Sequence, residues 1–395
     1  MDKKPRIGIF IDTFFPRIDG PTVGIDAISK IMQRDADITV FCPAPLNIPF
    51  DDSIYSYKVI RCRSKKIPFI KDVGYDWPSP NRQFRKLLNE TELDLVHIRS
   101  PFAVGKAGLR YAKKHKIPTV ITLHSQYKQD FKKATRSRFL AWLATKVIMR
   151  TYKKCDEVWS VNDATKQVLR EYGIKNEIIT MENGTSMLPV QNESDAIAKV
   201  NNNYNISPLQ KTLLYVGRIS KLKGIYFIAD VLKELKDKGQ DFKMIFVGDG
   251  PDFVRLKKYV HNLGLDDFIV FTGMLRDRDE LAKIYTRADL FMFPSFYDTD
   301  GVVKKEAACQ GTPIICIENS IVASSVIDRH NAFVGPNNIQ GFAAKIQDIL
   351  GNTDELIKVG TQAHKDLYIT WEQTAKKTLE RYHHLIQSRS NISRV

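Results

Sequence analysis

A junction in the second half of the chain reads PSFYDTDGVVKKEAACQGTP, residues 294–313. It follows an apolar run at 290–293 and leads into another at 313–317, which predicts a strand, a glycine turn, a helix and a second strand. Two carboxylates, Asp298 and Glu306, are separated by seven residues across the turn. We expect the first acid on the loop after the strand and the second on the first turn of the helix. Carboxylates accept hydrogen bonds from paired sugar hydroxyls, so the junction predicts a site for a ribose or a hexose.

A second junction of the same kind reads GRISKLKG, residues 217–224, between an apolar run and a helical pattern at 225–238. Gly217 permits a sharp turn close to a ligand. Arg218 and Lys223 bring positive charge to the start of the helix, where anions bind favourably. The segment therefore predicts a diphosphate site, although a solvated basic loop would have the same composition. A less specific glycine turn follows at VGDGP, residues 247–251, and includes Gly248.

Short apolar runs alternate with helical patterns along both halves of the chain. Strands rich in Ile and Val, without polar alternation and separated by helices, indicate parallel sheets covered on both faces. The expected strands are 7–11, 38–41, 95–98, 119–123, 157–160 and 177–180, then 213–216, 244–247, 269–271, 290–293 and 313–317. The expected helices include 22–34, 105–114, 139–154, 163–172 and 225–238.

This alternation predicts an α/β protein of two tandem Rossmann-like, doubly wound domains. We expect the domains at 1–190 and 205–370, with a helix at about 371–395 returning to the first domain. The stretch 191–208, rich in Asn, Ser and Asp, is predicted to be a linker. Doubly wound sheets bind ligands at the carboxyl ends of their strands, so all three junctions are placed to form one site.

The composition is that of an ordinary globular protein, with 395 residues, 43% hydrophobic and 27% charged. No apolar run approaches the roughly 18 residues that a membrane span needs. The apolar run at 7–11 is too short for a signal peptide. Five cysteines without a CxxC pair fit reduced, buried thiols and neither a disulfide nor a zinc framework. The cytoplasm is therefore the expected location.

The net charge of +15 is concentrated in the first half of the chain. Residues 1–190 contain 33 Lys and Arg against 20 Asp and Glu, whereas residues 191–395 contain 27 against 25. Such a one-sided field indicates an anionic partner of the first domain, either a membrane surface, a phosphorylated acceptor or nucleic acid. A surface that merely keeps the protein soluble is the alternative.

The three junctions together resemble the donor site of the retaining glycosyltransferases of GT-B fold in family 4, the glycosyl transferases of group 1. The hallmarks are G-R-x-x-x-x-K-G and E-x7-E followed by A-x-x-x-G-x-P. The resemblance implies an active site in the cleft between two Rossmann-like domains. It extends over nearly the whole chain through FPRIDG (15–20), LVHI (95–98), TLHS (122–125), ENG (182–184) and TWE (370–372).

The resemblance also implies roles for individual residues. Arg218 and Lys223 would neutralise the donor diphosphate, Glu306 would bind the ribose hydroxyls, and Asp298 would contact the hexose. His124 would face the sugar near the reacting carbon. The implied catalytic residues are His124, Asp298, Arg218 and Lys223. The implied donor-binding residues are Gly20, Gly217, Arg218, Lys223, Gly248, Asp298, Gly301, Val302 and Glu306.

This junction departs from the family pattern in three places. Asp298 stands where the common motif has Glu. Asp300 occupies a position where an aromatic residue is frequent, and Lys304 and Lys305 replace common apolar residues. Retaining transferases of this kind have no well-placed protein nucleophile, and the departing phosphate accepts the proton of the acceptor. Catalysis would then rest on electrostatic stabilisation of the leaving group. His124 would either act as a general acid/base with a pKa near neutrality or only orient the sugar.

Other protein classes fit the sequence less well. Asp298-Thr299-Asp300 resembles the metal-binding D-x-D motif of the other large glycosyltransferase fold. The tandem α/β pattern and Glu306 argue against that fold. We therefore expect neither a metal nor a cofactor. The segment after the first strand lacks the G-x-G-x-x-G of a dehydrogenase. A sugar-nucleotide epimerase shares the architecture. An RNA-binding protein would draw on the basic first half, but no RNA-module signature is present, so no nucleic acid is expected.

The acceptor is indicated by the stretch 128–154, which contains nine basic residues and one acid. Interleaved apolar side chains include Phe139, Trp142, Leu143 and Ile148, with a second basic and aromatic stretch at 61–77. Both resemble the surface by which family members that glycosylate diacylglycerol dock on anionic membranes. The resemblance implies a UDP-sugar, or else a GDP-sugar, as donor, a lipid or lipid-linked acceptor, and a peripheral location on the inner face of the cell membrane. One alternative is that the stretch forms a core helix with a solvent-exposed basic face. Another is that the acceptor is a capsule polysaccharide or another soluble oligosaccharide.

Overall fold

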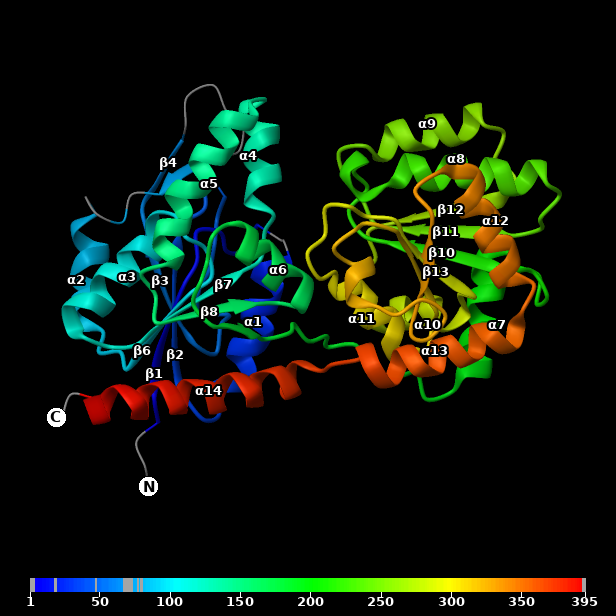
Figure 1. The fold of residues 1–395 in the computed structure, drawn as a ribbon. Coiled ribbons are helices and arrows are strands. Elements are labelled where there is room, and N and C mark those ends of the chain that lie inside the picture. The colour runs from blue at the N-terminus through cyan, green and yellow to red at the C-terminus, as the bar shows by residue number, and fades with distance from the viewer. Residues whose placement is uncertain are drawn as a thin grey trace. The chain divides into compact units, whose positions relative to one another are not determined.

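The computed structural model describes residues 4–17, 20–46, 48–66, 74–76, 78 and 81–392. The chain divides into two compact units, each with its own parallel sheet (Figure 1). Unit 1 consists of Met1–Gly184 and Trp371–Val395, and unit 2 consists of Thr185–Thr370.

The described residues of unit 1 form a parallel sheet of strand order β3-β2-β1-β6-β7-β8-β9. The order reverses where β1 pairs with β2 on one side and β6 on the other. Such a reversal opens a crevice at the carboxyl ends of the strands, which is where doubly wound sheets bind ligands. The strands are β1 (Arg6–Phe10), β2 (Asp37–Pro43), β3 (Lys58–Cys62), β6 (Leu95–Ile98), β7 (Thr119–Leu123), β8 (Glu157–Ser160) and β9 (Ile178–Thr180), with a separate antiparallel pair β4 (Ser64–Lys66) and β5 (Gly74–Asp76).

The last helix of the chain belongs to unit 1 and packs against its first helix (red and blue in Figure 1). The Trp371 ring fills the space over Gly24, where an added Cβ would lie 2.9 Å from the ring. Tyr382 stacks on Trp159 of the sheet with ring centroids 5.7 Å apart. The helices of unit 1 are α1 (Gly20–Met32), α2 (Arg82–Glu90), α3 (Ala103–His115), α4 (Tyr127–Thr135), α5 (Arg138–Tyr152), α6 (Asp163–Glu171) and α14 (Trp371–Ile392).

Unit 2, every residue of which is described, has a parallel sheet of order β12-β11-β10-β13-β14-β15. Its strands are β10 (Thr212–Val216), β11 (Lys243–Val247), β12 (Ile269–Gly273), β13 (Leu290–Phe293), β14 (Ile314–Ile317) and β15 (Phe333–Gly335). Its helices are α7 (Glu193–Tyr204), α8 (Ile225–Asp237), α9 (Phe253–Asn262), α10 (Arg278–Arg287), α11 (Val302–Cys309), α12 (Ile339–Leu350) and α13 (Thr353–Leu367). Buried side chains from both faces of the sheet form its core.

The linker predicted at 191–208 is wrong, because most of it folds as α7. Asn192 caps this helix by accepting a hydrogen bond from the backbone of Asp195, which is the usual role of Asn at a helix start. Ala196 and Val200 are one turn apart and both are buried, and Val200 packs into the core of unit 2. The polar residues that suggested a linker are therefore caps and the solvent side of a helix.

No helix in the described parts of the chain is both long and apolar enough to cross a membrane. All five cysteines are buried free thiols, as their number and spacing predict. Apolar packing, and not covalent cross-links, therefore holds each unit together.

Candidate functional site

The three predicted junctions lie at the carboxyl ends of neighbouring strands in unit 2. Residues 217–224 follow β10, residues 248–251 follow β11, and residues 294–301 follow β13. Strand β10 pairs with both β11 and β13, and the strand order reverses there. Segments that are far apart in the sequence therefore meet at one edge of the sheet, as predicted.

Two glycines of this edge have backbone angles that other residues rarely adopt. Gly217 and Gly248 have φ angles of +151° and +133°, which favour glycine. A Cβ on Gly248 would lie 2.0 Å from the carbonyl oxygen of Gly217, so no side chain fits there. Gly301 precedes Val302, the first residue of α11, and its added Cβ would lie 2.5 Å from the Phe293 ring. These turns leave backbone at the surface of the edge.

Lys223 and Asp298 contact each other directly. The Lys223 Nζ donates to Asp298 Oδ1, and the two side chains are only 23% and 16% exposed. The second carboxylate oxygen, Oδ2, is buried and has no hydrogen-bond partner among the described residues. Lys223, expected to bind the diphosphate, and Asp298, expected to bind the hexose, thus form one ion pair. The Asp298 Oδ2 atom remains as an acceptor without a described partner.

Glu306 is buried and held by two donors from α10. It is the fifth residue of α11, so it lies one turn deeper in the helix than predicted. Arg278 Nη2 donates to its Oε1 at 2.5 Å, and the Tyr285 hydroxyl donates to its Oε2 at 3.2 Å. Burial, and then the Glu306 carboxylate, raise the pKa of Tyr285 well above its usual value, so this hydroxyl remains a neutral donor. The carboxylate keeps further lone pairs for a diol.

The sequence reasoning did not identify Arg278 or Tyr285. Both precede Glu306 by more than 20 residues, and α10 carries no recognisable motif. The one available signal is that α10 follows β12, another strand of the same sheet, so its first residues start near the same edge. That signal does not single out Arg278.

The D-T-D segment presents each of its acids to a lysine. Asp300 is buried, with Oδ1 3.8 Å from the Nζ of buried Lys305, while Asp298 pairs with Lys223. An ammonium group competes with a metal ion for the same oxygens. In the described residues, no group of three or more His, Cys, Asp or Glu side chains is arranged to hold a metal.

The predicted residues of unit 1 lie at the carboxyl edge of its own sheet. His124 follows β7, and burial, together with the nearby Arg99 charge, lowers its pKa well below the usual value. The near-neutral pKa considered for His124 is therefore wrong, and the imidazole is neutral at physiological pH. Gly20 is the first residue of α1, and an added Cβ there would meet no atom within 4 Å. Residues 18 and 19 of the same motif lie outside the described residues.

The basic stretch 128–154 folds as the two contacting helices α4 and α5 (Figure 1). Of the interleaved apolar side chains, Ile148 is buried in the core of unit 1, as the alternative of a core helix predicts for it. The α5 outer face consists of five exposed apolar side chains: Phe139, Leu140, Trp142, Leu143 and Val147. Residues 67–73 and 77, in the second basic and aromatic stretch, lie outside the described residues.

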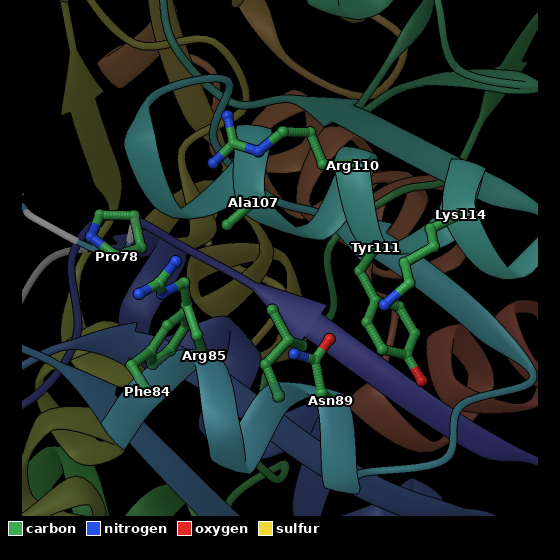
Figure 2. Close-up of a pocket in the computed structure, with 9 residues that line it drawn as sticks. Pro78, Phe84, Arg85, Asn89, Ala107, Arg110, Tyr111 and Lys114 are labelled. Carbon is green, nitrogen blue, oxygen red and sulfur yellow. The ribbon is translucent and has the colours of Figure 1, made fainter. Parts of the chain in front are cut away.

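A separate pocket of about 310 Å³ lies between α2 and α3 (Figure 2). Its floor is apolar and its rim is basic, and it contains none of the predicted site residues. It is lined by Pro78, Phe84, Arg85, Leu88, Asn89, Ala107, Arg110, Tyr111 and Lys114.

Comparison with solved structures shows the fold. Sucrose-phosphate synthase from Thermosynechococcus elongatus superimposes with a TM-score of 0.76 at 19% identity, over 98% of this chain and 100% of that one. The Anabaena protein HepE, solved with UDP and glucose, gives 0.74 at 16% identity over 96% and 99%. The two parallel α/β sheets thus have the predicted GT-B glycosyltransferase fold.

Sequence comparisons identify the family. The family model described as "Glycosyltransferase Family 4" matches residues 19–186. A second family model, described as "Glycosyl transferases group 1", matches residues 197–366. The α-monoglucosyldiacylglycerol synthase of Streptococcus pneumoniae is 27% identical over 82% of this chain and 74% of its own, and that of Acholeplasma laidlawii is 25% identical over 92% and 94%. The chain belongs to glycosyltransferase family 4. It is a retaining enzyme that uses a sugar nucleotide, which confirms the predicted family and enzyme class.

Proposed function

We propose that this enzyme transfers a hexose from a UDP-sugar to a lipid or lipid-linked acceptor at an anionic membrane surface on the cytoplasmic side. The α5 outer face is the observation that carries the proposal. Similar proteins also support the proposal. Two α-monoglucosyldiacylglycerol synthases match most of the chain, and HepE was solved with UDP and glucose.

Helix α5 has apolar side chains on two opposite faces. One face, with Ala141, Ile148 and Met149, is buried in unit 1. The opposite α5 outer face includes Phe139 at 67% and Trp142 at 44% exposure. A surface helix of a globular protein needs only one apolar stripe. A second, exposed stripe marks an interaction surface.

The charges around this face favour an anionic bilayer as its partner. All nine basic residues of 128–154 are exposed, against one acid, Asp130. Lys146 Nζ lies 3.9 Å from the Trp142 ring centre, so a cation and an aromatic ring are presented together. Basic residues near an anionic surface contribute about 1 kcal/mol each. Aromatic and Leu side chains on a basic helix insert at the headgroup level.

In unit 2 we assign the donor diphosphate to Arg218 and Lys223, the ribose hydroxyls to Glu306, and a hexose hydroxyl to Asp298. The Asp298 Oδ2 atom, buried without a described partner, supports the last assignment, since a sugar hydroxyl would satisfy it. The two donors on Glu306 orient its carboxylate. We also assign the turns at Gly217, Gly248, Gly301 and Val302 to the donor, because a glycine turn lets the backbone approach a ligand closely. Gly20 of unit 1 stays a predicted donor-binding residue, and an added Cβ there would meet no atom within 4 Å.

The proposed chemistry needs no protein nucleophile. The bond between the anomeric carbon and the β-phosphate oxygen breaks, while the acceptor hydroxyl attacks on the same face. Its proton passes to the departing phosphate oxygen. Arg218 and Lys223 stabilise the negative charge that grows on that phosphate. His124, which is neutral because burial lowers its pKa, orients the hexose and does not exchange a proton.

Vesicle sedimentation tests the membrane part of the proposal. The wild-type protein should sediment with vesicles of phosphatidylglycerol and phosphatidylcholine, but not with phosphatidylcholine alone, and raised salt should weaken binding. Changing Lys132, Lys133 and Arg136 to Glu should abolish sedimentation without changing the affinity for UDP. The matched control applies the same change to exposed basic residues of α9 in unit 2: Arg255, Lys257 and Lys258.

A second variant separates insertion from charge attraction. Phe139→Ser with Trp142→Ser should weaken binding and leave the remaining binding more sensitive to salt. If the wild-type protein stays in the supernatant with anionic vesicles at low salt, the membrane proposal is wrong. The family assignment would stand, and a soluble oligosaccharide acceptor would then be the better proposal.

A further inference from the structure

Arg99 is a buried arginine whose guanidinium has no partner among the described residues. It directly follows β6, and its backbone N–H donates to the carbonyl oxygen of Phe10 at 2.8 Å, which fixes it at the carboxyl edge of the sheet in unit 1. Arg99 as a whole residue is only 9% exposed, and its Nε atom is buried. Within the described parts of the chain, Nε is the guanidinium atom that is buried without a hydrogen-bond partner.

The polar groups around Arg99 are neutral. His97 contacts the Tyr382 hydroxyl through Nδ1 at 2.5 Å and the Thr122 hydroxyl through Nε2 at 2.7 Å. Burial, and then the Arg99 charge, lower the pKa of both His97 and His124 well below the usual value. Burial lowers the pKa of Arg99 itself to about 10, and Tyr382 is the one group that opposes this shift. The guanidinium is thus charged at pH 7 with no carboxylate of the described chain beside it.

Other buried arginines in this protein are fully compensated. Arg287 donates to Asn201, to Asp289 and to two backbone carbonyl groups. Arg61 makes a bidentate contact with Asp52 and a bond to a carbonyl oxygen. A buried charge without a partner is costly, and folds avoid it unless a ligand supplies the counter-charge. Arg99 therefore differs from these structural arginines because its guanidinium has no partner within the described chain, as expected of a residue that binds a ligand.

We propose that Arg99 binds an oxyanion, a phosphoryl or carboxylate group, at the carboxyl edge of the sheet in unit 1. Strands β6 and β7 are neighbours there, so Arg99 and His124 lie at the same edge. A guanidinium fork matches such a group through two parallel hydrogen bonds. The anion belongs either to the donor diphosphate or to the acceptor. The site itself requires neither the membrane proposal nor the donor residues assigned in unit 2.

Thermal unfolding of the full chain, in chloride and in inorganic phosphate at matched ionic strength, tests this proposal. Arg99→Met removes an unpaired buried charge, so it should raise the unfolding temperature in chloride by about 3–8 °C. Phosphate should raise the unfolding temperature of the wild type by about 2–5 °C more than that of Arg99→Met. Arg34→Met, at an exposed arginine, is the matched control and should change neither quantity.

Arg99→Lys keeps the charge but loses the fork, so it should need a several-fold higher phosphate concentration for the same stabilisation. Calorimetry with UDP then identifies the source of the anion: weaker UDP binding by Arg99→Met indicates the donor diphosphate, and unchanged binding indicates the acceptor. The proposal fails if Arg99→Met unfolds below the wild type or keeps the full phosphate effect. It also fails if Arg99→Lys matches the wild type. Because these measurements use phosphate and no acceptor, their failure would leave the proposed transferase function untouched.

Discussion

Replacing Asp298 by Asn should tighten the binding of free UDP, although it should slow sugar transfer. In the free enzyme the Lys223 ammonium is already engaged by Asp298. A diphosphate that uses Lys223 must share or displace this carboxylate, so part of its binding free energy is lost. The amide of the variant would keep the shape of the side chain and remove the charge. Free UDP has no hexose, so it isolates this competition from the proposed hexose contact.

The size of the effect follows from the burial of the pair. A charge-assisted hydrogen bond contributes about 1.5–3 kcal/mol when it is well shielded from solvent. The two side chains are 23% and 16% exposed, so some screening applies. Allowing for it, we expect about 1–1.5 kcal/mol, which is about a 5- to 12-fold lower Kd for UDP.

Isothermal titration calorimetry on a double-mutant cycle measures this effect. Asp298→Asn should strengthen UDP binding when Lys223 is present and should have no effect in the Lys223→Met background. Asp267→Asn removes an exposed acid elsewhere in unit 2 and controls for the overall change in charge. Equal or weaker UDP binding by Asp298→Asn would refute the reasoning, because it would mean that the diphosphate does not use Lys223.

Three further predictions concern the same enzyme. Glu306→Gln should weaken UDP binding by about 1.5–3 kcal/mol, as measured by calorimetry. The affinities of the variant and the wild type for 2′-deoxy-UDP, which lacks one ribose hydroxyl, should differ less than their affinities for UDP. Turnover should persist in excess EDTA, and its loss with recovery in Mn²⁺ would make the D-T-D segment a metal site. Because the pKa of His124 is lower when folded than when unfolded, protonation favours the unfolded chain, and stability should fall as the pH drops below about 6.5. His124→Gln should make that fall shallower in urea titrations at pH 5 and pH 7.

The sequence was sufficient to predict the central strands of both sheets and the junctions that follow them in unit 2. Central strands of parallel sheets are apolar on both faces, so β10 and β13 stand out as runs of hydrophobic residues. Strand β3, Lys58–Cys62, was not predicted, because an edge strand mixes charged and apolar residues. Helix α7 was taken for a linker because its buried face needs few apolar residues when the rest faces solvent.

The contacts within the site could not be predicted from spacing alone. The Lys223–Asp298 pair joins two loops 75 residues apart, and only the pairing of β10 with β13 brings them together. The lack of a described partner at Arg99 is equally invisible in the sequence, where it is one basic residue among many in the first half. Such features depend on which side chains share a buried environment, and local patterns carry no information about that.

The charge pairs of the site bear on the role proposed for Arg218. The departures from the family pattern at Asp300 and Lys305 compensate each other, because the two buried groups face one another and neither is left as a lone charge. Asp298, Asp300 and Glu306 are each paired with a cation before any ligand binds, so a diphosphate would bring uncompensated negative charge. Arg218 is exposed, as is Lys221 in the same loop, and in unit 2, all of whose residues are described, neither side chain pairs with a carboxylate, so both cations are available to a diphosphate. The balanced pairs are Lys223–Asp298, Lys305–Asp300 and Arg278–Glu306.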